Sequence, residues 1–191
     1  MQHQTILSWI SKSIRLSEPH QSKIREAFEP LAADKGDHLV QAGEVAEHLY
    51  FVNQGFLRCY TLDAEGNELT THLVGPGYLV TTFDSYMHAT PSPESLQCLS
   101  HCQLLRISHA QYRRLFEEIP GWSTFCNGVY ERYIQQSNGR LLSMQQLSAT
   151  QRYEQFLQQH PQVALHTPIK HLASYLGIQP QSLSRIRSQI S

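Results

Sequence analysis

The chain has 191 residues, of which 40% are hydrophobic, so it can form one large domain or two small ones with a real core. Its formal net charge of −1 excludes a uniformly basic nucleic-acid-binding chain. No apolar run approaches the ~20 residues of a membrane span, and residues 1–10 lack the pattern of a signal peptide, so we expect a cytoplasmic protein with reduced thiols.

The N-terminal segment, residues 5–33, shows the apolar spacing of helices. Ile6, Leu7 and Ile10 lie on one helical face, and Pro19 begins a second segment. Ser17 is a suitable N-cap for that segment. We therefore expect residues 5–33 to be helical.

From residue 36 to residue 107 the pattern changes to short strands separated by glycine turns. The turn glycines recur every eleven or twelve residues, at Gly43, Gly55, Gly66 and Gly77. Regular turns of this kind are typical of a β-sandwich or jelly roll. Residues 63–67 resemble a hairpin loop.

Helices return at Ser108. The first is predicted over 109–118 and ends before Pro120, and a long helix follows from Trp122 to about Met144. We interpret the apolar stripe of the long helix as a dimer interface formed by Trp122, Phe125, Val129 and Tyr133. Gly128 and Gly139 share a face and would allow close helix approach. The alternative is that this stripe packs onto the chain's own β domain.

The last forty-five residues, 147–191, predict a helix-turn-helix. A helix over 150–159 is followed by a short apolar helix that ends at Gly177 and a second helix that begins at Pro180. Leu183, Ile186 and Ile190 form the buried face of the second helix. Its other face carries groups suited to base edges or phosphates: Gln181, Ser182, Ser184, Arg185, Arg187 and Ser188. Four basic residues and one acid give this segment a net charge of +3, which leaves −4 on the rest.

The order of β-roll, long helix and helix-turn-helix resembles the Crp/Fnr family of bacterial transcription regulators. The resemblance rests on segments 35–40, 43–52, 76–77 and 173–187, and it covers nearly the whole chain. It implies a cyclic-nucleotide-binding-like jelly roll, a dimerising helix and a DNA-binding domain in which Arg185 reads guanine. Gln181 stands where the family commonly has a glutamate, and Ser191 follows the second helix directly, so we expect no wing beyond it.

The sensing pocket departs from this family pattern. Cyclic-nucleotide binders use a glycine-glutamate segment and a later arginine-serine pair, and the matching segments 77–80 and 90–95 contain neither pair. A cyclic phosphate buried without a cation would be costly. We therefore expect no cyclic AMP and no other cofactor. The expected lining of an effector pocket is Tyr78, Thr81, Thr82, Ser92, Glu94 and Ser95.

No metal or catalytic residue is assigned from the sequence. Cys98 and Cys102 on one strand would lie ~13 Å apart, too far to share a zinc ion, and no cysteine precedes Cys59 to form an N-terminal iron–sulfur cluster. Eleven histidines leave haem binding or a cupin-like metal enzyme as alternatives, although the paired His-x-His motif of cupins is absent.

The sequence therefore predicts an α+β protein with three parts. These are a sensor jelly roll at 1–118, a dimerisation helix at 119–146 and a helix-turn-helix domain at 147–191. We expect a homodimeric, non-enzymatic regulator that binds double-stranded DNA and has no membrane partner. RNA polymerase and a small-molecule effector are further candidate partners. The alternative is a ligand-binding module without DNA binding. The sequence reveals neither the effector, nor the operator, nor whether transcription is activated or repressed.

Overall fold

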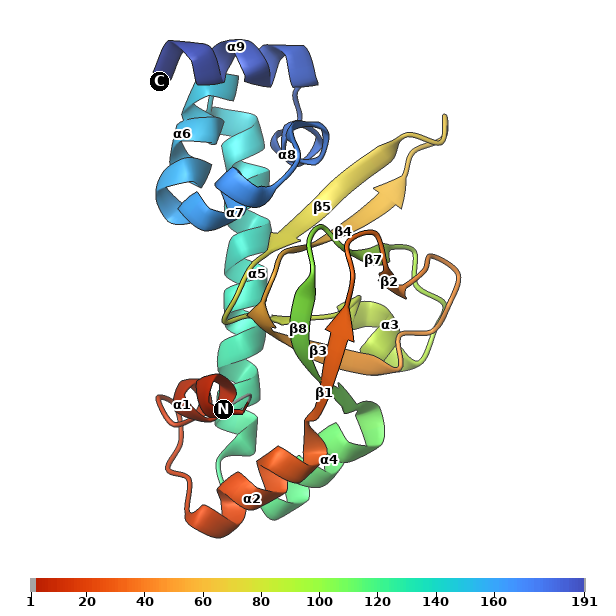
Figure 1. Cartoon of the computed structure of the whole chain (residues 1–191), viewed down its shortest axis with the longest axis vertical. Coiled ribbons are helices and arrows are strands. Elements are labelled where there is room, and N and C mark those ends of the chain that lie inside the picture. Colours follow the sequence, from red (N-terminus) through yellow and green to blue (C-terminus); the bar gives the residue numbers. More distant parts are fainter. Residues whose placement is uncertain (1–2, 191) are drawn as a thin grey trace.

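The structure is a computed structural model that describes residues 3–190, so Met1, Gln2 and Ser191 lie outside the described residues. It combines a β-roll, a layer of helices at one end of the roll, a long helix and a C-terminal helical domain (Figure 1). This arrangement of a jelly roll and helices confirms the α+β fold expected from the sequence.

The roll consists of two four-stranded sheets in which every pairing is antiparallel. The first sheet has the order β1-β8-β3-β6, with the strands β1 (Glu29–Ala33), β8 (Cys102–Ser108), β3 (His48–Gln54) and β6 (Leu79–Val80). The second has the order β2-β7-β4-β5, with the strands β2 (His38–Val40), β7 (Ser95–Cys98), β4 (Leu57–Leu62) and β5 (Glu68–Val74). A short helix, α3 (Phe83–His88), follows β6. The hairpin of β4 and β5 extends toward the C-terminal helices (Figure 1).

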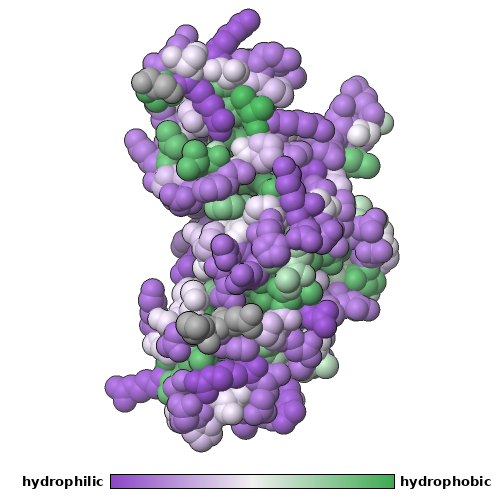
Figure 2. Space-filling model, viewed as in Figure 1, coloured by the Kyte–Doolittle hydropathy of each residue, from purple (hydrophilic) through white to green (hydrophobic). Residues whose placement is uncertain are grey.

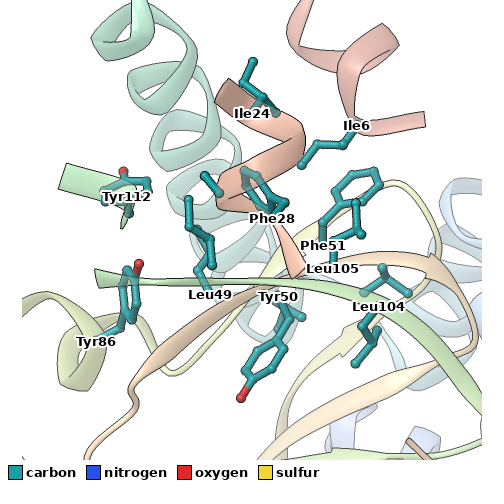
Figure 3. Close-up of a cluster of buried hydrophobic side chains, with 14 of the residues drawn as sticks. Ile6, Ile24, Phe28, Leu49, Tyr50, Phe51, Tyr86, Leu104, Leu105 and Tyr112 are labelled. Carbon is teal, nitrogen blue, oxygen red and sulfur yellow. The ribbon is translucent and has the colours of Figure 1, made fainter. Parts of the chain in front are cut away.

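Helices cover the outer face of the first sheet. They are α1 (Gln4–Ile10), α2 (Glu18–Ala27) and α4 (His109–Glu118). Alternate side chains of β3 point to opposite sides, so Phe51 faces Phe28 and the helical layer while Tyr50 faces the roll interior (Figure 3). Both sides of this sheet are therefore buried in one apolar core.

The N-terminal segment differs in one respect from the prediction that residues 5–33 are helical. Ser17 caps α2 by accepting a hydrogen bond from the backbone N–H of His20, as expected. Residues 29–33, predicted to be helical, instead form β1. Their pairing with β8 overrides the local apolar pattern, because it gives this segment backbone partners along five residues.

The C-terminal half is helical. The long helix α5 (Trp122–Gln146) runs from the base of the roll to the C-terminal domain (Figure 1). That domain consists of α6 (Ala149–Gln159), α7 (Pro161–His166), α8 (Ile169–Leu176) and α9 (Pro180–Ile190). Helix α9 buries Leu183 and Ile186, while Ile190, expected on the same buried face, is 41% exposed.

Cys98 and Cys102 do not share a strand. Cys98 ends β7 and Cys102 begins β8 in the other sheet, so the separation calculated for one strand does not apply. All four cysteines are buried free thiols.

Candidate functional site

A cavity of about 690 Å³ lies where the roll, α5 and the C-terminal domain meet. The roll contributes β5, residues 78–81 and Phe83, α5 contributes its second half, and the C-terminal domain contributes α6 and α8. The cavity is therefore bounded by all three parts of the chain. A ligand held there would contact both the roll and the helix-turn-helix domain.

Three of the six predicted pocket residues line this cavity: Tyr78, Thr81 and Glu94. The other three are buried outside it: Thr82, Ser92 and Ser95. Two of these hydroxyls have structural partners instead. The hydroxyl of Ser92 donates to the backbone carbonyl of Glu94 at 2.7 Å, and that of Ser95 accepts from a backbone N–H at 3.0 Å.

The roll wall of the cavity contains a group of possible metal ligands that the sequence pattern does not predict. Cys59 of β4, His72 of β5 and Glu94 each offer one ligand atom, and these atoms lie within 4.8 Å of one another. Burial raises the pKa of the Cys59 thiol, and burial lowers the pKa of His72. The thiol and the imidazole are therefore both neutral at neutral pH.

The register of β4 and β5 explains why this group is hard to read from the sequence. Counting outward from the hairpin loop pairs Tyr60 with Thr70, which would place Thr71 opposite Cys59. A β-bulge shifts the register by one residue and pairs Cys59 with His72 instead. The strand pattern gives no sign of this bulge.

Two arginines form the cationic side of the cavity, on the helices rather than on the roll. Arg140 of α5 donates to the carbonyls of Tyr175 and Thr70 at 3.1 and 3.4 Å, and burial lowers its pKa. Arg152 of α6 donates to the carbonyl of Leu176 at 3.0 Å. On the roll side, the described lining includes the carboxylate of Glu94 and neither lysine nor arginine.

A buried arginine joins the roll to the helix-turn-helix domain. Arg58 of β4 donates to the carboxylate of Glu68 at 3.0 Å and to the side-chain oxygen of Gln97 at 2.7 and 2.9 Å. It also lies 2.7 Å from Nδ1 of His171 on α8. The hydroxyl of Ser174, also on α8, donates to the carbonyl of Glu68 at 3.1 Å. We call these five residues the α8 latch.

The predicted recognition helix, α9, exposes a polar face. Gly177 ends α8 with φ +67°, a left-handed conformation that glycine adopts at low cost, so the chain turns sharply into α9. Five of the six predicted DNA-contacting residues are exposed: Gln181, Ser182, Ser184, Arg185 and Ser188. Arg187 is half-buried, because it donates to the carbonyl of Ala164 at 3.1 Å and lies over the ring of Tyr153.

The open face of α5 differs from the stripe predicted to bind a second chain. Trp122 and Phe125 are buried in the core of the protomer, and Val129 packs against that core. Tyr133 lines the cavity and stacks on His72 at 5.0 Å between ring centroids. The stripe thus packs onto the chain's own roll, which was the alternative interpretation. Three large apolar side chains of α5 are exposed instead: Ile134, Leu141 and Leu142.

The surface as a whole is mostly hydrophilic. Figure 2 shows apolar patches on one face, over the C-terminal helices and over the roll. Within residues 3–190, no helix is both long enough and apolar enough to cross a membrane.

Comparison with known proteins identifies the roll. The sequence pattern of the cyclic nucleotide-binding domain matches residues 30–119. These residues are similar to that domain family. The match covers β1 to α4, and these elements supply the roll wall of the cavity.

The similarity to whole proteins extends beyond this domain. The cAMP-activated global transcriptional regulator CRP of Haemophilus influenzae is 24% identical over 119 residues, which are 62% of this chain and 53% of that protein. The chain therefore spans about half the length of this curated relative.

Solved structures show the same fold over most of the chain. FixK2 from Bradyrhizobium japonicum has a TM-score of 0.76 at 16% identity, covering 85% of this chain and 84% of that one. The c-di-GMP responsive global regulator CLP of Xanthomonas campestris has a TM-score of 0.70 at 14% identity, covering 91% of each chain. The chain therefore has the fold of Crp/Fnr-family transcriptional regulators, which is the fold that the sequence resemblance implied.

Proposed function

We propose that this protein is a cytoplasmic, non-enzymatic transcriptional regulator that binds double-stranded DNA as a homodimer. The observation that carries the proposal is the exposed polar face of α9 beside a sharp helix-turn-helix junction. A helix presented in this way can enter the major groove, where Arg185 can donate two hydrogen bonds to a guanine. Serines along the same face are suited to phosphate oxygens.

The cavity is the proposed effector site. A cyclic nucleotide is a poor match, because its phosphate would meet the carboxylate of Glu94 on the roll while the donors of Arg140 are directed to backbone carbonyls. An effector in this cavity would contact α5 and α8 together. Binding would then act by shifting the population between the docked arrangement and one in which the α8 latch is open.

DNA binding can be tested with the purified full-length chain. We expect fluorescence anisotropy with a fragment selected from pooled genomic DNA to show binding that weakens as salt rises, because phosphate contacts release counterions. Arg185→Ala should reduce affinity for the selected fragment by about 5- to 150-fold, the range for one bidentate base contact. Absent or salt-insensitive binding would contradict the proposal and favour a ligand-binding module without DNA binding.

The matched control is Arg113→Ala. Arg113 is an exposed arginine of α4, at the opposite end of the molecule from α9 (Figure 1). This variant loses the same charge without touching α9, so its affinity should stay within about twofold of the wild type. Equal losses for the two variants would show that net charge, rather than Arg185, determines the affinity.

A further inference from the structure

Three side chains in the roll wall converge as a metal site would require. The ligand atoms of Cys59, His72 and Glu94 lie within 4.8 Å of one another and come from two adjacent strands and a loop. In a tetrahedral zinc site, ligands at about 2.0–2.3 Å from the metal stand about 3.4–3.8 Å apart. Small side-chain movements would therefore close this group around one ion.

The backbone fixes the position of each group. Cys59 and His72 are direct cross-strand partners, and the bulge next to them sets this pairing. Glu94 precedes Ser95, which pairs with Tyr60 on the other side of β4. The loop before Glu94 is held by a hydrogen bond of 3.1 Å from the hydroxyl of Thr61 to a backbone carbonyl. A site built on paired strands in this way is largely preorganised.

The surroundings of His72 also suit a ligand. An imidazole that binds a metal through one nitrogen commonly makes a hydrogen bond through the other. Nε2 of His72 lies 3.4 Å from the hydroxyl of Ser137 on α5, and its ring stacks on Tyr133 of the same helix. The imidazole is therefore held between β5 and α5.

The chemistry of the three groups selects the ion. A thiolate and an imidazole favour Zn²⁺ and related borderline ions over Mg²⁺ and Ca²⁺, which prefer oxygen ligands. The thiol of Cys59 would release its proton to solvent on binding, and thiolate and carboxylate together would balance the two charges of the ion. The three groups line the cavity, so the fourth coordination position would face that space and accept water or a small ligand.

We propose that Cys59, His72 and Glu94 bind one Zn²⁺ ion per chain in this cavity. Within residues 3–190 this is the single group of three or more histidine, cysteine or acidic side chains with such geometry. The ion would link the roll to α5 through His72 and its contacts. Binding of the ion does not depend on the proposed DNA binding.

The proposal can be tested by titrating the metal-free full-length chain with Zn²⁺ against a chromophoric chelator, and with Co²⁺ by absorption spectroscopy. We expect one equivalent of either ion, with a thiolate-to-cobalt charge-transfer band in the near ultraviolet. Cys59→Ser should abolish that band. Glu94→Gln, which keeps the shape of the side chain, should weaken Zn²⁺ binding at least about tenfold, the lower end of the effect of even an outer-shell partner.

The controls use residues of the same types away from the group. Cys126→Ser removes another buried thiol, and Glu47→Gln removes another carboxylate, which is exposed. Both should keep the band and the affinity. Binding without a thiolate band, or an equal loss in Glu94→Gln and Glu47→Gln, would overturn the proposal and assign the metal to surface histidines.

Two further measurements keep the outcomes separate. Circular dichroism checks that each variant is folded, and if Cys59→Ser fails to fold, Glu94→Gln still decides the result. Anisotropy with the selected DNA fragment on the same preparations shows whether DNA binding is retained. A wild-type chain that binds the DNA fragment but no Zn²⁺ would overturn the metal site alone. A wild-type chain that binds Zn²⁺ but no DNA would overturn the regulator alone.

Discussion

At the scale of single residues, the α8 latch shows how a buried charge is kept in place. Arg58 is only 2% exposed, yet its guanidinium has a carboxylate, an amide oxygen and an imidazole as partners. Its hydrogen bond holds the pKa of Glu68 at about 2. A buried charge satisfied in this way is tolerated, whereas removing one partner leaves an uncompensated charge and is strongly destabilising.

His171 makes the latch sensitive to pH. Burial, and secondarily the charge of Arg58, lowers its pKa from 6.5 to about 4. Between these pH values the unfolded chain binds more protons than the folded one. The contribution of neutral His171 to the free energy of unfolding is therefore complete above about pH 6.5 and is lost as the pH falls toward 4. We expect a loss of about 1–2 kcal/mol, because water partly screens the half-buried ring.

The measurement is the free energy of unfolding in urea across pH 4–7, compared with His171→Gln. Glutamine can still accept a hydrogen bond from Arg58 but does not titrate, so the variant should lose less stability on acidification. Burial also lowers the pKa of His48 and His160, so these histidines add to the loss of stability in acid. The effect of His171 is therefore read from the difference between the pH profiles of the variant and the wild type. His88→Gln alters an exposed histidine and serves as the control; a flattened pH profile in that variant would refute the assignment.

At the scale of elements, the turn between α8 and α9 depends on one glycine. Gly177→Ala places a side chain at φ +67°, and the new Cβ would also meet Sδ of Met144 at 3.0 Å. The flexible end of the methionine can move, so the main cost is the backbone, about 1–2 kcal/mol. Thermal unfolding should show the corresponding fall in Tm.

Gly128→Ala provides the opposite expectation for the same substitution. Gly128 lies inside α5 without a positive φ, and a Cβ added there would meet no atom of residues 3–190 within 4 Å beyond its own helix backbone and chain neighbours. Alanine should therefore raise stability by about 0.5–1 kcal/mol. If both variants were destabilised alike, the special role of Gly177 in the turn would be refuted.

The same elements show what the sequence can predict about the fold. The bounds of α4 and the cap Ser17 follow from local signals, and the structure has both. The turn at Gly177 also follows from local signals, because it requires only a residue that tolerates positive φ. The strand β1 is missed because only its partner β8 makes it a strand, and α7 is missed because it has six residues and little periodicity.

The candidate site is harder to predict because it depends on contacts between distant segments. Tyr78, Thr81 and Glu94 are expected from their loops and do line the cavity. Cys59 and His72 meet only because of a bulge, and the arginines of the cavity come from α5 and α6. Such a site forms only when the roll packs against the helices, and residue spacing alone does not predict this packing.

At the scale of the whole molecule, α5 has two faces with different roles. One face packs on the roll and lines the cavity, where Tyr133 and Arg140 lie. The other exposes Ile134 and Leu141, which are 55% and 58% exposed and seven residues apart. Gly139 is five residues from Ile134, so it lies about 140° round the helix. The predicted close approach at the glycines would therefore use a different face from the exposed apolar one.

The seven-residue spacing of Ile134 and Leu141 is that of one seam in a two-stranded coiled coil. We expect the wild-type chain to sediment as a dimer through this face, since pairing would remove apolar side chains from water. Ile134→Glu and Leu141→Glu should each shift the equilibrium toward monomer in analytical ultracentrifugation. Leu165→Glu, at a leucine of α7 that is 73% exposed, should leave the dimer intact. A wild-type monomer at every concentration, or an equal effect of Leu165→Glu, would show that α5 does not hold two chains together. A dimer lost only in the α5 variants would place the contact on this face of α5. A two-fold axis through that contact would relate the two α9 helices by symmetry, as binding two DNA half-sites requires.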